Sequence, residues 1–200
     1  WKAVSDVYTE EWLKKNWGEI KPIPLENIKT LNDGADINLD KNRNLKALYS
    51  PGHAKHHYTF YDEFSGTVFM GDTLGLIYPH GSFVQLNLPP PDFDQEILFE
   101  SLNKIEKLNL NQLAIAHFGI HKNPYELIRN AKESINSWIE FINKLPNRSD
   151  TVASEEIVNW IITNYKSLGI DEGTINNYIG NGHFEMQING VRRFLNNKKL

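Results

Sequence analysis

The chain has 200 residues, enough for one folded domain with a small addition, and 40% of these residues are hydrophobic while 23% are charged. This composition is that of a globular protein and excludes a disordered or fibrous one. The net charge of −4 provides no general attraction for nucleic acid or anionic lipid, so neither is an expected partner.

The sequence contains no cysteine and no long apolar run. Disulfides, thiolate metal sites and cysteine nucleophiles are therefore excluded, and any bound metal must be held by histidine and carboxylate side chains. No run approaches the roughly 20 apolar residues of a membrane-spanning helix, and charged residues interrupt the first residues where a signal peptide would be apolar. Because the absence of cysteine suits a reducing compartment, we expect a cytoplasmic protein.

The first part of the chain predicts a helix, a connector and two strands. Aromatic and apolar residues recur at helical spacing over residues 5–17, with Ser5 or Thr9 as candidate N-caps. Two prolines and an Asp-Gly pair follow, as is typical of a connector that leads into a turn. Two short alternating runs, at residues 37–39 and 45–49, then predict a pair of strands.

A predicted hairpin follows a turn that contains three histidines. The runs HYTFYD and GTVFMG are rich in β-branched and aromatic residues, and the short segment EFSG joins them. The outer ends of a hairpin lie close together. We therefore expect the histidines at residues 53–57, just before the first strand, to be neighbours of Asp72, just after the second.

The next segments predict helices on either side of a buried strand. Residues 93–108 place apolar side chains on one helical face behind Asp92 or Asp94 as caps. The run QLAIAHFG then indicates a buried strand that ends at His117, and Pro124 begins a long amphipathic helix.

A polar linker separates this part of the chain from a helical end. The pattern beyond the linker predicts helices over residues 154–168 and 184–196. We place a domain boundary in the linker, with the first domain over residues 1–146 and a helical appendage over residues 151–200.

Three residues with metal-binding side chains, His53, Asp72 and His117, stand where a predicted strand meets a loop. One carboxylate and two imidazoles suit zinc, iron or manganese, and an aspartate between two ions can bridge them. Each residue also has an ordinary structural interpretation. A single histidine at a strand end is commonly a hydrogen-bonded surface residue, and Gly-Asp is commonly a turn.

The motifs YSPGHAKHH, VFMGD and IAHFG, in this order and at these strand ends, resemble the later motifs of the metallo-β-lactamase superfamily, which includes the glyoxalase II-like thioester hydrolases. The resemblance covers roughly residues 22–145. It implies an α/β fold, namely the C-terminal portion of a metallo-β-lactamase αββα sandwich with a C-terminal helical appendage. Residues 1–146 would then be the metallo-β-lactamase-like domain.

The resemblance also implies a role for each residue of the motifs. His53 and His117 would each bind one of two metal ions, and Asp72 would be the bridging carboxylate that takes part in catalysis. His57 would be a supporting residue that forms hydrogen bonds around the site, and His56 is a second candidate for that role.

The chemistry that the resemblance implies is that of a dinuclear metal-dependent hydrolase. Zinc is the first expectation for the two ions, with iron or manganese as alternatives. A metal-bound hydroxide would attack a thioester or other ester-like bond of a small-molecule substrate, although relatives on the same scaffold hydrolyse lactones, phosphodiesters and β-lactams. The loop after Asp72 either lines the substrate pocket or packs against the domain. Its candidate pocket residues are Tyr78, His80, Phe83 and Gln85.

The sequence departs from the family at one point, because the leading HxHxDH motif that supplies the remaining ligands is absent. Since the chain starts at Trp1 rather than at a methionine, we expect the N-terminal half of the same fold to precede it and to complete the site. The chain alone would then bind metal weakly and be poorly active.

The alternative is a degenerate metallo-β-lactamase-fold module with a non-catalytic binding or assembly role. The helical appendage could cover the pocket, form a homodimer or cap the domain.

Overall fold

The computed structural model describes residues 9–19, 21–40, 42–77, 84–117, 119–145, 150–181 and 184–198. The chain divides into two compact units, residues 1–31 and residues 32–200. In the first unit, Thr9 caps helix α2 (Glu10–Trp17) by accepting the Trp12 N–H, as predicted, and the turn η1 (Leu25–Asn27) follows. The predicted helix residues 5–8 lie outside the described residues.

The second unit is built on a six-stranded sheet with the strand order β1-β2-β3-β4-β7-β8. Strands β4 and β7 are parallel, and all other neighbours are antiparallel. The predicted strand pair and hairpin are both present. The strands are β1 (Asp36–Asp40), β2 (Arg43–Tyr49), β3 (Tyr58–Asp62), β4 (Thr67–Gly71), β7 (Gln112–Ile115) and β8 (Ile120–His121), and a separate two-stranded sheet contains β5 (Leu76–Ile77) and β6 (Val84–Gln85).

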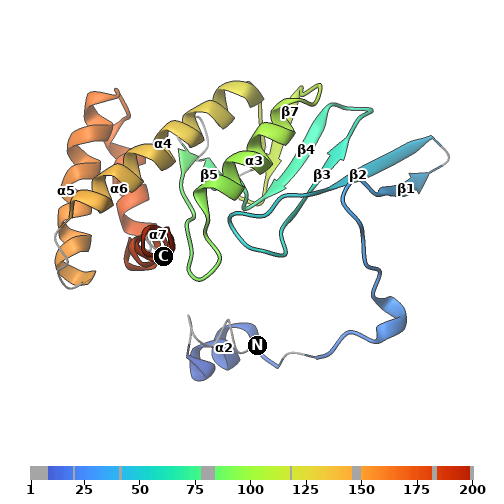
Figure 1. Cartoon of the computed structure of the whole chain (residues 1–200), viewed down its shortest axis with the longest axis horizontal. Helices are drawn as coiled ribbons and strands as arrows, with labels where there is room; N and C mark the ends of the chain where they lie inside the picture. Colours follow the sequence, from blue (N-terminus) through green and yellow to red (C-terminus); the bar gives the residue numbers. More distant parts are fainter. Residues whose placement is uncertain are drawn as a thin grey trace. The chain divides into compact units, whose positions relative to one another are not determined.

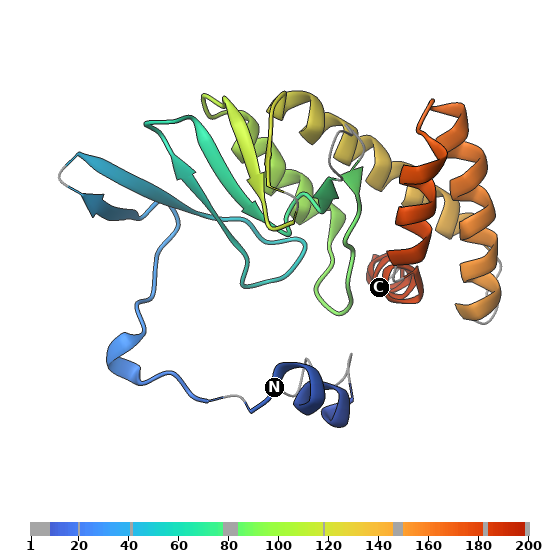
Figure 2. The same ribbon diagram turned by 180° about the vertical axis from the view of Figure 1, so that it is seen from behind.

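Helices α3 (Gln95–Glu106) and α4 (Pro124–Lys144) lie on one face of the six-stranded sheet, as the opposite views in Figures 1 and 2 show. Alternate side chains of a strand point to the same face. On the central strands the alternate residues Val68, Met70 and Leu113 are fully buried, and they form the core with these helices. Burial of these side chains stabilises the layered arrangement of sheet and helices.

The two helices begin where the sequence predicts. Asp94 caps α3 because its carboxylate accepts the Ile97 N–H, and Pro124 is the first residue of α4. A proline suits the first turn of a helix, since the N–H that it lacks would have no partner within the helix.

Three helices form the end of the chain: α5 (Asp150–Ser167), α6 (Glu172–Asn181) and α7 (Phe184–Asn197). Helix α5 begins before the predicted residue 154, and α6 was not predicted. These helices pack on α4 through buried aromatic rings, and Trp138 Nε1 donates a hydrogen bond of 3.0 Å to the Tyr165 hydroxyl. Burial raises the pKa of Tyr165 to about 12. Among the described residues, no helix has the length and apolar character needed to cross a membrane.

Candidate metal centre

Asp72 lies in a tight turn at the end of β4. The turn is closed by hydrogen bonds from the Thr73 N–H to the Met70 carbonyl and from the Gly75 N–H to the Asp72 carbonyl. Gly71 has a φ of +52°, in the left-handed region that glycine adopts without strain. The Gly-Asp pair of the sequence is therefore a turn, and it also presents the carboxylate at the edge of the sheet.

His53 lies in the loop between β2 and β3, which is fixed against the start of α3. The Gly52 carbonyl accepts the Asp94 N–H at 2.9 Å, and a Cβ on Gly52 would lie 2.4 Å from the Leu98 Cα. The ring of His53 is held by a 3.0 Å hydrogen bond between Nδ1 and the Asn87 carbonyl. A carbonyl only accepts, so Nδ1 carries the proton and the Nε2 lone pair faces Asp72.

His117 follows β7 and reaches the same edge of the sheet. Because β4 and β7 are parallel, their carboxyl ends lie side by side. A hydrogen bond from the Ala116 N–H to the Gly71 carbonyl joins the two strand ends directly. The side chain of His117 is half exposed.

The structure brings these three predicted residues together around the Asp72 carboxylate. His53 Nε2 lies 3.9 Å from Asp72 Oδ2, and His117 Nε2 lies 3.5 Å from Asp72 Oδ1. Both separations exceed an ordinary hydrogen bond. Asp72 Oδ1 is buried, and it accepts no hydrogen bond from the described part of the chain.

The separations between the imidazole nitrogens and the carboxylate oxygens suit a divalent cation between them better than a direct hydrogen bond. A zinc ion about 2.0–2.2 Å from an imidazole nitrogen and from a carboxylate oxygen holds these two donors roughly 3–4 Å apart. The unsatisfied Asp72 Oδ1 is the atom that such an ion would bind. The fit is partial, because no group of three or more His, Asp or Glu side chains suited to one metal ion occurs within the described ranges. These residues therefore supply two donors to each of two positions, fewer than the three protein ligands of a catalytic zinc.

His57 supports the Asp72 turn through both ring nitrogens. Nε2 accepts the Asp72 N–H at 3.1 Å, and Nδ1 lies 2.8 Å from the Thr73 hydroxyl. Since Nε2 accepts, Nδ1 carries the proton and donates it to Thr73. Burial, and then the neighbouring His53, lower the pKa of His57 to about 4 and keep the ring neutral. Both nitrogens are thus already hydrogen-bonded within the turn.

The other predicted site residues are not brought to the carboxylate in the described structure. His56 is exposed in the turn before β3. Tyr78 and His80 lie outside the described residues, as does Phe83. Gln85 is buried in β6.

Two groups around the site were missed by sequence reasoning. Thr73, the hydrogen-bond partner of His57, directly follows the Gly-Asp pair, so its position was a usable signal. The role of the Asn87 carbonyl could not be recognised in the sequence, because any residue provides the same backbone oxygen.

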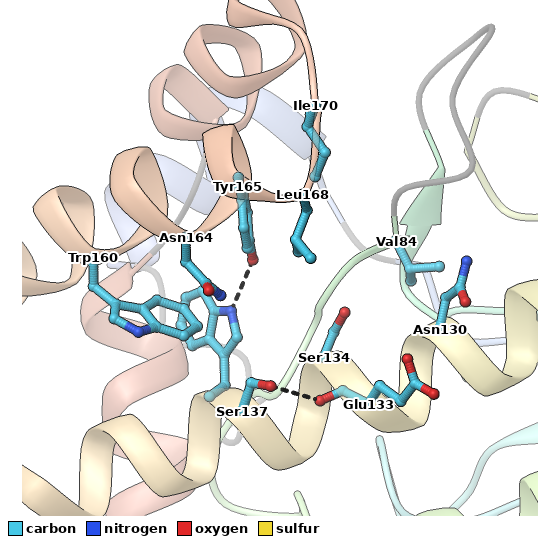
Figure 3. Close-up of a pocket in the computed structure, with 11 residues that line it drawn as sticks. Val84, Asn130, Glu133, Ser134, Ser137, Trp160, Asn164, Tyr165, Leu168 and Ile170 are labelled. Carbon is cyan, nitrogen blue, oxygen red and sulfur yellow. Dashed lines mark hydrogen bonds between the residues drawn. The ribbon is translucent and has the colours of Figure 1, made fainter.

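A separate cavity of about 330 Å³ lies between α4 and α5 (Figure 3). None of the residues that line it is a candidate metal ligand. Its walls combine aromatic rings, such as Trp160 and Tyr165, with polar side chains of α4, such as Asn130 and Glu133. The cavity therefore lies between α4 and the helical end of the chain, apart from the candidate metal centre.

The model of the metallo-beta-lactamase superfamily matches residues 3–117, which is more than half of the chain. The chain belongs to the metallo-β-lactamase superfamily. This membership confirms the resemblance in the motifs, and the superfamily includes metal-dependent hydrolases. No curated protein matches the chain.

Two solved structures of the superfamily share the fold. A metallo-beta-lactamase superfamily protein from Sulfolobus tokodaii aligns with a TM-score of 0.58 and 18% identity, over 96% of this chain and 61% of that protein. A metallo-beta-lactamase family protein from Thermus thermophilus aligns with a TM-score of 0.63 and 19% identity, over 100% of this chain and 58% of that protein. At these identities the likeness shows the fold alone, and it confirms the predicted α/β class. The chain spans about three fifths of the length of each protein.

Proposed function

We propose that this chain carries part of the site of a dinuclear metal-dependent hydrolase that acts on a thioester or other ester-like bond of a small molecule. The observation that supports the proposal is the arrangement around Asp72. One carboxylate oxygen faces His53 Nε2 at 3.9 Å, and the other faces His117 Nε2 at 3.5 Å. A carboxylate between two imidazoles in this manner suits a bridge between two cations.

Each side chain would have a distinct role. His53 and His117 would each hold one ion, and Asp72 would hold both. Divalent ions, when bound, would supply a water whose pKa is lowered to about 7 and would polarise the carbonyl oxygen next to the bond that is cleaved. The Asn87 carbonyl keeps the His53 lone pair directed at the site, and the neutral His57 fixes the backbone of Asp72. Because imidazole and carboxylate ligands suit all three metals, zinc is the first expectation, and iron or manganese are the alternatives.

The remaining ligands would come from the N-terminal half of the same fold. The superfamily's HxHxDH motif is absent from the sequence, and the described residues offer two donors to each ion. A catalytic zinc commonly has three protein ligands. We therefore expect weak metal binding and low activity from the 200 residues alone.

A binding or assembly module is the second candidate function. The observation that favours it is the absence, among the described residues, of any group of three or more donors for one metal ion. In that case Asp72 and the imidazoles around it would serve as hydrogen-bonded structure, and metal would not bind at this edge of the sheet.

Zinc titration of the chain tests the proposal. We expect Asp72→Asn to weaken zinc binding by more than about 10-fold, because it removes an anionic ligand. Substitution of a hydrogen-bond partner of a ligand already weakens metal binding by about 10–100-fold. Asp36→Asn, a matched change on the exposed strand β1, should leave the affinity unchanged. Equal zinc affinity of Asp72→Asn and the unmodified chain would exclude the metal site and favour the assembly role. In a protein that also contains the HxHxDH half, thioester hydrolysis should be lost with Asp72→Asn.

A further inference from the structure

A short segment that starts at the last residue of β6 makes close contacts with three parts of the structure. The Gln85 carbonyl lies so near Gly75 that a Cβ there would be 2.2 Å from the oxygen. Two residues later, the Asn87 carbonyl accepts the hydrogen bond of His53. The next carbonyl, that of Leu88, faces helix α7. This segment therefore connects the Asp72 turn, the His53 ring and the last helix.

The contact with α7 depends on Gly190, which lies in the middle of the helix. A Cβ on Gly190 would lie 1.9 Å from the Leu88 oxygen, 3.0 Å from the Leu88 carbonyl carbon and 3.2 Å from the Pro89 carbonyl carbon. A glycine inside a helix costs about 1 kcal/mol relative to alanine. The close approach of two backbones explains the glycine, because any side chain would push the helix and the segment apart.

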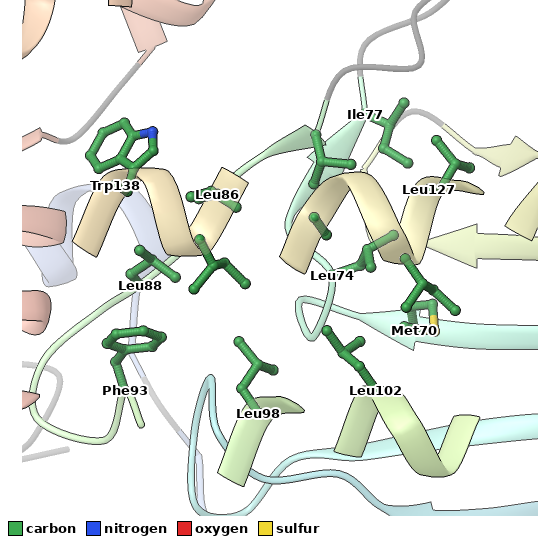
Figure 4. Packing of buried hydrophobic residues seen from close by; sticks show 14 of the residues in the cluster. Met70, Leu74, Ile77, Leu86, Leu88, Phe93, Leu98, Leu102, Leu127 and Trp138 are labelled. Atoms are coloured by element: carbon green, nitrogen blue, oxygen red, sulfur yellow. The ribbon is translucent and has the colours of Figure 1, made fainter. Parts of the chain in front are cut away.

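The segment is closely packed, so it has little space in which to move away from α7. Leu86 and Leu88 are each 1% exposed, and Figure 4 shows Leu88 between Trp138 of α4 and Phe93. The Phe93 ring in turn contacts the Phe194 ring of α7, with 5.6 Å between the ring centroids. In a closely packed interior a forced displacement passes to the neighbouring backbone. The nearest functional group along the chain is the Asn87 carbonyl.

We propose that Gly190 of α7 is a positioning residue for His53. By allowing α7 to approach Leu88, it holds the Asn87 carbonyl against Nδ1 of His53 and so keeps the Nε2 lone pair directed at Asp72. The helical end of the chain then forms part of the support of the candidate metal centre. The inference rests on the proposed function only where it treats His53 as a ligand.

The tautomer of His53 tests the proposal without any metal. In the metal-free chain labelled with ¹⁵N-histidine, NMR spectra of the ring nitrogens at mildly alkaline pH report which nitrogen carries the proton, and the spectrum of His53→Gln assigns the signals. We expect Nδ1–H in the unmodified chain. In Gly190→Ala we expect a shift toward Nε2–H, the tautomer that imidazole favours in water.

Gly180→Ala is the matched control. Gly180 lies in the neighbouring helix α6, and a Cβ there would meet nothing within 4 Å. This variant should leave the His53 signals unchanged. A folded Gly190→Ala chain with unchanged His53 signals would overturn the proposal. If Gly190→Ala does not fold, the unmodified chain supplies the test, and an Nε2–H tautomer of His53 in that chain overturns the proposal.

Zinc affinity separates this inference from the proposed function. If both hold, Gly190→Ala weakens zinc binding by about 10–100-fold, as is typical when a hydrogen-bond partner of a ligand is disturbed. If the tautomer shifts while Asp72→Asn leaves zinc affinity unchanged, the positioning role stands and the metal site is excluded. If Asp72→Asn weakens binding while Gly190→Ala changes neither the tautomer nor the affinity, the positioning role is wrong.

Discussion

The Nε2 atom of His117 lies 3.5 Å from Oδ1 of Asp72, at the point where the parallel strands β4 and β7 both end. The hydrogen bond from the Ala116 N–H to the Gly71 carbonyl fixes this approach through the backbone. The relative position of the two side chains is therefore set by the sheet, which gives the candidate metal centre a rigid support.

Substitutions of His53, His117 and His56 should differ in their effect on metal binding. We expect His53→Gln and His117→Gln each to weaken zinc binding by more than about 10-fold, because each removes one of the two donors that the described residues offer to an ion. His56→Gln is the control, since His56 is exposed and close in sequence to His53. Competition with a chromophoric chelator measures the affinities. A comparable loss in all three variants would argue for nonspecific binding of zinc by histidine.

Gly71→Ala should destabilise the fold for two reasons. A left-handed backbone costs a residue with a Cβ about 1–2 kcal/mol, and the added Cβ would lie 2.6 Å from His57 Nε2. Gly34→Ala separates the two effects, because Gly34 has a φ of +77° but no atom within 4 Å of the added Cβ. Urea unfolding should show a larger loss of unfolding free energy for Gly71→Ala. Equal losses would mean that the His57 ring moves aside without cost.

Thr73→Val should destabilise the chain although it preserves the shape of the side chain. Thr73 is 2% exposed, and its hydroxyl is the partner of His57 Nδ1. A buried polar group that loses its partner costs about 1–3 kcal/mol. Thr163→Val on α5 is the control, because that hydroxyl is exposed and donates a hydrogen bond to the Asn159 carbonyl of its own helix. Thermal unfolding of both variants measures the difference, and no excess loss for Thr73→Val would contradict the role given to His57.

The stability of the sheet should depend on pH through Asp62. The hydrogen bond from Arg43, at 2.5 Å, is the main cause that holds the pKa of Asp62 below its ordinary value of 3.8. A carboxyl whose pKa is lower in the folded state contributes stability above its unfolded pKa, and this contribution is lost as the pH falls through the folded pKa. Arg43→Met should therefore reduce the unfolding free energy at neutral pH. The difference in unfolding free energy between this variant and the unmodified chain should become smaller below about pH 4.

Urea unfolding over a range of pH checks this expectation. Lys144→Met removes a matched partner from the exposed pair Lys144–Glu140 on α4, and its effect at neutral pH should be smaller because solvent screens exposed charges. An Arg43→Met difference that stayed constant down to acidic pH would show that the arginine acts through packing rather than through the Asp62 charge.

Strong periodic segments made the central fold predictable from the sequence. The hairpin of β3 and β4 and the starts of α3 and α4 were placed correctly, because alternation, caps and Pro124 are local signals. Strands β5, β6 and β8 have two residues each and are too short to show a period. Helix α6 was missed because its sequence, EGTINNYIGN, is rich in glycine and asparagine, which favour turns.

The side chains of the candidate site could be predicted from the sequence, whereas the backbone contacts that support them could not. His53, Asp72 and His117 were found because each follows or precedes a recognisable strand. The contact of Gly190 with Leu88 depends on how distant segments pack, and a glycine within a helical pattern does not reveal it. The predicted boundary between residues 146 and 151 stays a prediction, and the compact second unit extends from residue 32 to residue 200.

Anomalous X-ray diffraction from crystals of this chain grown with zinc, recorded on both sides of the zinc absorption edge, tests the central claim most directly. The account predicts anomalous density between the Asp72 carboxylate and the Nε2 atoms of His53 and His117. Density confined to other histidines, or none at this carboxylate in zinc-saturated crystals, would contradict a metal centre at the ends of β4 and β7.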